Sequence, residues 1–197
     1  METHPPLAQK KRCDAAFGSA QSEIEALKAQ AQRGELTLAF MDEAGFAQTP
    51  PNRGAWTPAG ECHAATAVRG KRLNILGALL STGALFTAKL WCNTTAELFA
   101  GFLDLLVEQV GKPLTIILDN ASVHTAKAIK PLMEQLRKKG LTLYFLPPYS
   151  PELNRIEIFW RKVKYEWMAF KTRDSKTLET DLDDIFAKFG EHYQLTF

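Results

Sequence analysis

Cysteine is scarce in this chain of 197 residues, and its placement excludes several classes of protein. The three cysteines, Cys13, Cys62 and Cys92, are far apart, and no Cys-x-x-Cys pair occurs. An odd number of isolated cysteines supports neither a disulfide framework nor a zinc knuckle. We therefore expect a protein of a reducing compartment, the cytoplasm.

Long hydrophobic runs and a strong net charge are also absent. The longest apolar stretch, residues 73–90, is interrupted by Asn74, Ser81, Thr82 and Gly83, and the N-terminus has no apolar core of the signal-peptide type. These features predict a protein that neither spans a membrane nor is exported. The formal net charge of +2 is too small to indicate nucleic-acid binding by itself.

The remaining composition is that of an ordinary globular protein, with 46% hydrophobic and 23% charged residues. This length suffices for one well-buried domain with a short appendage. We expect residues 1–35 to form a flexible arm with a short helix at 22–33, where Ser22 and Glu25 make a capping box. Residues 36–173 are the main domain, and residues 174–197 form a C-terminal helix packed on it.

Hydrophobic periodicity predicts strands first and then an alternation of strands and helices. Strands are expected at residues 36–41, 73–80 and 85–91, with an irregular strand at 53–57 and a helix from the capping box at 94–97 to Gly111. The second half has strands at 114–118 and 141–146, and helices at 125–139, 156–170 and from Ser175 onward. This order predicts an α/β, ribonuclease H-like fold, a mixed five-stranded sheet flanked by helices with the first and fourth strands adjacent.

Three acidic residues each follow a hydrophobic segment. Asp42 follows residues 36–41, Asp119 follows residues 114–118, and Glu157 comes after residues 141–146 and a proline-rich loop. Ligands gather at the carboxyl ends of parallel strands, so Asp42 and Asp119 should lie close together. Carboxylates suit Mg²⁺, and two ions about 3.5 to 4 Å apart can support phosphoryl transfer. The pattern therefore predicts a metal site.

Three segments carry a family resemblance. They are Phe40-Met-Asp-Glu-Ala-Gly-Phe46 with Arg53 and Trp56, Leu118-Asp-Asn-Ala-Ser-Val-His124, and Leu146-Pro-Pro-Tyr-Ser-Pro-Glu-Leu-Asn-Arg-Ile-Glu-Ile-Phe-Trp160. Together they resemble the DDE endonuclease domain of insertion-sequence transposases related to mariner, the IS six-thirty type. The third segment is the most specific. By this resemblance, residues 36–173 are a DDE catalytic domain.

The resemblance implies that Asp42, Asp119 and Glu157 are the catalytic acids and hold two Mg²⁺ or Mn²⁺ ions. It implies an enzyme that cleaves phosphodiesters of double-stranded DNA at insertion-sequence ends and transfers the strand to target DNA, as a homodimer on DNA. Glu152 is the alternative third acid. We favour Glu157, because it begins a helix that can rest on the sheet, whereas Glu152 lies in a rigid proline turn.

Four other polar residues near these motifs have competing interpretations. His124 contacts the scissile phosphate or satisfies backbone groups at a helix start. Glu43 is a helper ligand or a surface residue, and strand alternation favours the surface. Asn120 and Asn154 are expected to brace loops rather than to act in catalysis.

The helix expected at residues 156–170 also carries aromatic and basic residues. Trp160 and Trp167 have the spacing of core residues, which favours packing over base stacking. Basic residues cluster on and just after this helix: Arg161, Lys162, Lys164, Lys171 and Arg173. Such a cluster is a solvated face in most proteins, but beside an active-site helix it predicts a DNA phosphate-contacting surface, with Arg161, Lys162 and Lys164 as its first members.

Full-length members of this family carry N-terminal helix-turn-helix modules, and 35 residues before the first strand are too few for them. We expect a separate or frameshift-fused reading frame to supply that part. A catalytically silent, truncated DNA-binding or assembly remnant is the alternative. A ribonuclease H or resolvase-type nuclease would share the fold, but the Ser-Pro-Glu-Leu-Asn block favours transposition.

Overall fold

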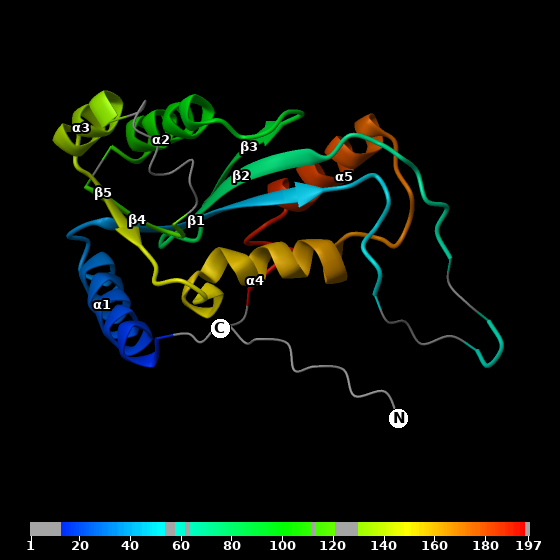
Figure 1. Ribbon diagram of the computed structural model, residues 1–197, viewed down its shortest axis with the longest axis horizontal. Coiled ribbons are helices and arrows are strands. Elements are labelled where there is room, and N and C mark those ends of the chain that lie inside the picture. Colours follow the sequence, from blue (N-terminus) through cyan, green and yellow to red (C-terminus); the bar gives the residue numbers. More distant parts are fainter. Residues whose placement is uncertain (1–12, 54–57, 62–63, 112, 121–129, 196–197) are drawn as a thin grey trace.

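The computed structural model describes residues 13–53, 58–61, 64–111, 113–120 and 130–195, and its centre is a five-stranded sheet (Figure 1). The strands are β1 (Thr37–Phe46), β2 (Leu73–Leu80), β3 (Leu85–Leu90), β4 (Leu114–Leu118) and β5 (Leu141–Phe145). Their order is β3-β2-β1-β4-β5; β2 is antiparallel to β1 and β3, and β4 is parallel to β1 and β5. The predicted ribonuclease H-like sheet, with the first and fourth strands adjacent, is confirmed.

Helices cover both faces of the sheet (Figure 1). On one face, the α2 face, lie α2 (Ala96–Val110) and α3 (Lys130–Lys138). On the other, the α4 face, lie α1 (Asp14–Gln32), α4 (Arg155–Lys162) and α5 (Ser175–Ala187). Strand β1 alternates between the two cores, so that Ala39 and Met41 belong to the α2 face while Phe40 and Ala44 belong to the α4 face.

Strand β1 is longer than the sequence indicates. The prediction ended it before Asp42, but it continues to Phe46, and Asp42 pairs with Gly77 of β2. Pairing with β4 stops at Phe40, so the last six residues of β1 are paired on the β2 side only. Because this part of β1 has an unpaired edge, the Asp42 carboxylate can be accommodated within the strand.

The observed helix boundaries show how accurately capping motifs predict where a helix starts. The prediction that α1 begins at Ser22 is wrong, because the helix starts at Asp14 and the Ser22 hydroxyl donates to the Gly18 carbonyl within it. The predicted start of the last helix at Ser175 is confirmed, and its N-cap is Asp174, whose carboxylate accepts from the Thr177 amide at 2.7 Å. Polar residues near a helix start define the boundary only to within a turn or so.

The helix that begins with α4 changes form along its length. The 3₁₀ turn η3 (Pro151–Leu153) precedes α4, and the π-helical turn η4 (Val163–Trp167) follows it, with the Met168 amide donating to the Val163 carbonyl at 3.0 Å. Extra residues of this kind often occur at functional sites. Residue 170, the predicted end, lies beyond the helix.

The connection between β1 and β2 extends past the end of the sheet (Figure 1). Arg53 is not part of a strand, and the rest of the predicted strand at 53–57 lies outside the described residues. The Arg173 amide and the Thr172 hydroxyl donate to the Gln48 and Thr66 carbonyls, which fixes the described parts of this connection to the segment before α5.

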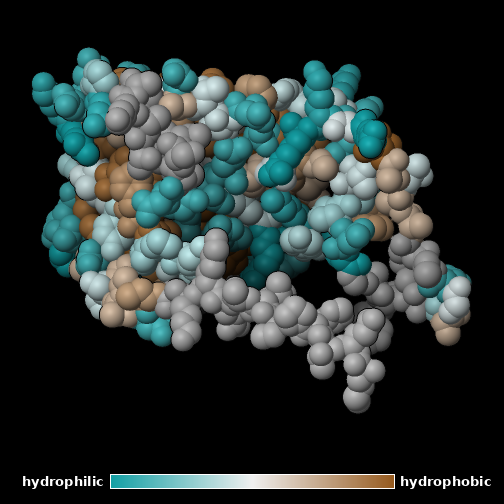
Figure 2. Space-filling model, viewed as in Figure 1, coloured by the Kyte–Doolittle hydropathy of each residue, from teal (hydrophilic) through white to brown (hydrophobic). Residues whose placement is uncertain are grey.

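The exposed surface in the same view is mostly hydrophilic, with hydrophobic residues in small separate areas (Figure 2). Within the described ranges, no helix is long and apolar enough to cross a membrane.

Candidate active site

The first two predicted acids come together because β1 and β4 are parallel neighbours. Phe40 of β1 pairs with Ile117 of β4, and Asp42 and Asp119 each come two residues after these paired residues. Adjacent strands are about 4.8 Å apart, which puts the two carboxylates at the same place on the sheet edge. Asp42 is largely buried, and Asp119 is exposed just past the end of β4.

The third acid is brought close by helix α4, which lies directly on the sheet. Gly77, the partner of Asp42 on β2, makes this approach possible, because a Cβ on Gly77 would stand 2.5 Å from Cζ2 of Trp160. Glu157, Trp160 and Lys164 follow one another at helical spacing and therefore share a face of the helix. That face is turned to Asp42, since Glu157 and Lys164 both act electrostatically on its carboxyl.

Burial and crowding perturb the titration of this cluster. Desolvation, then the Glu157 carboxylate and more weakly Asp119, raise the pKa of Asp42 to about 7. Burial also raises the pKa of Glu157, with Asp119 adding to it and Lys164 opposing it. The pKa of Lys164 is lowered by burial and by the Arg72 guanidinium, against the pull of Asp42 and Glu157. Such perturbation by both burial and specific charges is typical of functional sites.

Two asparagines brace this arrangement, as the sequence predicted. The Asn154 side chain, 3% exposed, donates to the carbonyl of Met41, the residue before Asp42, at 2.9 Å. The Asn154 carbonyl accepts from the Glu157 amide at 3.0 Å, so this one residue connects the segments of two of the acids. The Asn120 side chain donates to the Leu146 carbonyl at 2.8 Å and joins the ends of β4 and β5.

A cavity of about 340 Å³ opens between these elements. Its lining combines two of the acids with the proline-rich loop: Asp119, Asn120, Leu146, Pro147, Pro148, Tyr149, Ser150, Pro151, Asn154 and Glu157. Glu152 and Glu157 are both exposed, but only Glu157 lines this cavity. Tyr149 has a φ of 60°, which is uncommon for a residue other than glycine, and no sequence pattern predicts this conformation.

The donor set suits a hard divalent cation. Three carboxylates converge, one of them desolvated, and a bound cation would offset their mutual repulsion. Among the described residues, however, no three acidic, histidine or cysteine side chains are close enough to form a complete metal site. A cation would therefore have to draw the carboxylates together.

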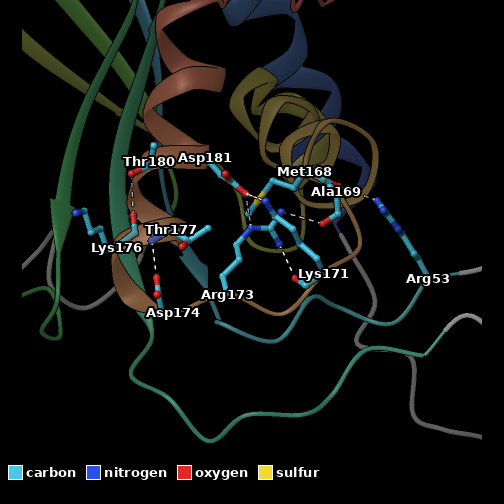
Figure 3. Close-up of polar contacts among 10 residues, drawn as sticks. All are labelled: Arg53, Met168, Ala169, Lys171, Arg173, Asp174, Lys176, Thr177, Thr180 and Asp181. Atoms are coloured by element: carbon cyan, nitrogen blue, oxygen red, sulfur yellow. Dashed lines mark hydrogen bonds and ion pairs between the residues drawn. The ribbon is translucent and has the colours of Figure 1, made fainter.

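The predicted basic surface is only partly available to DNA. Arg173 is 4% exposed, and its guanidinium donates to Asp181 and to the carbonyls of Ala169 and Lys171 (Figure 3). It therefore contributes to the core rather than to a phosphate-contacting surface. Lys171 also forms an ion pair with Asp181.

The other residues proposed for DNA binding differ in their surroundings. Lys162 forms an ion pair with Glu166 at 2.8 Å, Arg161 is exposed, and Lys164 turns toward the acids. His124 lies outside the described residues. Glu43 is exposed, as strand alternation predicted.

The two tryptophans pack in the core, as the sequence predicted. Trp160 is 2% exposed and contacts the ring of Phe46 edge-on, and Trp167 packs against Phe159 and Tyr193.

Known proteins resemble this chain in sequence and in fold. The uncharacterized protein y4pE/y4sA of Sinorhizobium fredii (strain NBRC 101917 / NGR234) is 35% identical over 75 residues, which are 38% of this chain and 47% of that protein. The matched part thus spans about half of this curated relative.

Among solved structures, the catalytic domain of Mos1 mariner transposase has a TM-score of 0.60 at 13% identity, over 94% of this chain and 85% of that one. The Mos1 mariner paired end complex with Mn has a TM-score of 0.60 at 15% identity, over 95% of this chain and 59% of that one. At these identities the likeness shows a shared fold.

The family assignment comes from the sequence match. Residues 37–179 match the family described as DDE superfamily endonuclease. This range contains all five strands and the elements that carry Asp42, Asp119 and Glu157. The chain belongs to the DDE superfamily endonuclease family.

Proposed function

We propose that this chain is the catalytic domain of a DDE transposase of the mariner-related, IS six-thirty insertion-sequence type. It cleaves DNA phosphodiesters at the ends of the element and transfers the freed strand to target DNA. The observation that carries the proposal is the convergence of Asp42, Asp119 and Glu157, from β1, β4 and α4, at one edge of the sheet. The Mos1 structures of similar fold include complexes with Mn and with Mg, and a strand transfer complex.

In this proposal, Asp42, Asp119 and Glu157 hold two Mg²⁺ or Mn²⁺ ions, which when bound supply activation of the attacking oxygen and stabilisation of the leaving one. Water then attacks the phosphorus and breaks its bond to the 3′-oxygen, which leaves a 3′-hydroxyl and a 5′-phosphate. The 3′-hydroxyl attacks a phosphodiester of the target, forms a new bond to that phosphorus, and releases the target strand's own 3′-oxygen as a 3′-hydroxyl.

The protein's own groups provide position and charge. Asn154 holds Asp42 and Glu157 in a fixed relation, and Lys164 lowers the cost of gathering their negative charges. Little covalent chemistry is required of side chains, because positioning and charge neutralisation dominate such reactions. The partners are double-stranded DNA, a second copy of the chain on that DNA, and a separately encoded or fused helix-turn-helix module.

A plasmid-nicking assay tests the proposal. Purified protein with supercoiled DNA should produce nicks in Mn²⁺ or Mg²⁺ and none in EDTA. Asp42→Asn, Asp119→Asn and Glu157→Gln should each abolish nicking while leaving the protein folded, because each keeps its shape and loses a metal-binding charge. Glu152→Gln is the matched control and should nick like the wild type.

Two results would count against the proposal. Nicking lost in Glu152→Gln and kept in Glu157→Gln would make Glu152 the third acid. A folded wild-type protein that nicks no DNA with either metal would support the catalytically silent remnant instead.

A further inference from the structure

A second cavity, of about 270 Å³, lies beside the acids at the far end of β1. It is enclosed by the end of β1, the start of the following connection and the turn η4. Its apolar wall includes Phe46, Pro50, Pro51 and Met168, and its basic side chains are Arg53, Arg72, Lys164 and Arg173. Arg72 was not singled out by any sequence motif.

The position of Arg72 depends on a glycine. Its guanidinium fills the space beside Gly45 of β1, where an added Cβ would stand 1.5 Å from the Arg72 Nε. A side chain at position 45 would therefore displace the guanidinium. In the described part of the chain, Arg72 forms no ion pair with a carboxylate.

Arg72 and Lys164 are two like charges held close to each other, with Arg72 exposed and Lys164 half-buried. The Lys164 ammonium lies 5.3 Å from the centre of the Phe46 ring, and it experiences the positive charge of Arg72. Two neighbouring cations repel, and burial adds to the cost, so an anion placed between them would be bound favourably.

The other two arginines of this cavity are already engaged. The Arg53 guanidinium donates to the Tyr165 carbonyl at 2.7 Å. It also donates to the Met168 carbonyl at 3.2 Å (Figure 3). Arg173 is satisfied by Asp181 and two carbonyls. These contacts fix the wall of the cavity and leave Arg72 and Lys164 as its anion-binding pair.

We propose that Arg72, together with Lys164, binds a phosphate of the DNA strand next to the phosphodiester that is cleaved. The proposal rests on the proposed function, since that function places DNA at the acids. Gly45 follows Asp42 by three residues, about 10 Å along β1, and by strand alternation these two positions face opposite sides of the strand. The side chain common to both places is Lys164, which lines the cavity together with Arg72. Lys164 interacts electrostatically with Arg72 in the cavity and with Asp42 and Glu157 among the acids. One DNA strand can therefore pass from the acids to this cavity.

Fluorescence anisotropy with a labelled duplex, at several salt concentrations and with Ca²⁺ in place of Mg²⁺, tests this site. Arg72→Gln should weaken DNA binding about 5-fold to 10-fold and reduce the salt slope by about one. Arg72→Lys should keep the slope, because the charge remains. Gly45→Ala should weaken binding as Arg72→Gln does, because its Cβ displaces the guanidinium.

Arg137→Gln is the matched control. Arg137 is an exposed arginine at the end of α3 that does not line this cavity, and its loss should leave the affinity unchanged. Melting curves of all variants identify any that fail to fold. If Arg72→Gln is unfolded, Gly45→Ala and Arg72→Lys decide the question.

The outcomes separate this site from the function on which it rests. Wild-type protein that binds and nicks DNA, with Arg72→Gln and Gly45→Ala equal to it, overturns the phosphate site alone. Wild-type protein that neither binds nor nicks DNA overturns both. Inorganic phosphate that binds the wild type at millimolar concentration and not Arg72→Gln, while both proteins bind the duplex equally, would identify free phosphate, rather than DNA, as the ligand.

Discussion

At the scale of single residues, Asp42 is a carboxylate whose neighbours oppose its ionisation. It is buried against α4, and the Glu157 and Asp119 carboxylates lie around it. A group of this kind stabilises a protein only while it is protonated, unless a cation or another positive charge accompanies it. The arrangement is costly for the metal-free fold and suited to binding a cation.

This cost predicts how stability depends on pH. The pKa of Asp42 rises from 3.8 to about 7 on folding, so the folded chain binds more protons between these values, and stability falls as pH rises through this window. In EDTA, Asp42→Asn should be more stable than the wild type at pH 8, by on the order of 2 to 4 kcal/mol, and nearer to it at pH 5. Urea unfolding at the two pH values measures this.

Glu43→Gln is the control for this measurement, since Glu43 is the exposed neighbouring acid. It should follow the pH dependence of the wild type. Equal pH dependence in the wild type and Asp42→Asn would show that Asp42 is not desolvated in the folded protein.

Asn154 provides a second residue-scale prediction. Asn154→Ala removes the hydrogen bond to Met41 O and should destabilise the chain by about 1 to 3 kcal/mol. It should also reduce nicking more than this loss of folded protein explains, because Asp42 and Glu157 lose their common brace. Asn93→Ala, at an exposed site before α2, is the control. Nicking that falls only in proportion to the unfolded fraction would make Asn154 purely structural.

At the scale of elements, the contact of α4 with β2 determines where the third acid lies. Gly77→Ala would place a Cβ 2.5 and 2.8 Å from two atoms of the Trp160 ring and 3.1 Å from Cδ1 of Ile156. We expect a loss of about 1 to 3 kcal/mol from overpacking, and lower nicking as α4 moves away from Asp42. Thermal unfolding and the nicking assay measure the two effects.

Gly101→Ala is the matched control, since no atom lies within 4 Å of the added Cβ on the exposed side of α2. Helix propensity predicts that it stabilises the chain, by up to about 1 kcal/mol. A stable, fully active Gly77→Ala protein would show that α4 does not depend on this close approach.

Several elements could be predicted because their signals are local. Strands β2 and β4 are nearly continuous hydrophobic runs, and α2 is bounded by Thr95 and by Gly111 at a φ of 60°. The start of α1 could not be predicted, because several polar residues near it are able to cap a helix. The π-helical turn η4 has no sequence signal of its own; packing of the chain around Arg173 and Arg53 accompanies it.

At the scale of the whole molecule, the order of the strands could be predicted from the sequence. The hydrogen bonds that side chains make to distant segments could not. The alternation of strands and helices allows few topologies, and the parallel pairing of β1 with β4 then brings Asp42 to Asp119. By contrast, Asn154 bonds to Met41 across 113 residues, and Arg173 bonds inward rather than to solvent. Such contacts depend on how distant segments pack, which no local pattern contains.

The proposed function requires that Asp42, Asp119 and Glu157 bind divalent cations as one site. Isothermal titration calorimetry with Mn²⁺, on the wild type, Asp119→Asn and Glu152→Gln at pH 8, tests it most directly. We predict saturable binding to the wild type and to Glu152→Gln, with a rise in melting temperature at millimolar Mn²⁺, and loss of both effects in Asp119→Asn. Equal Mn²⁺ binding by Asp119→Asn and the wild type, or no binding to a folded wild-type protein, would contradict the claim.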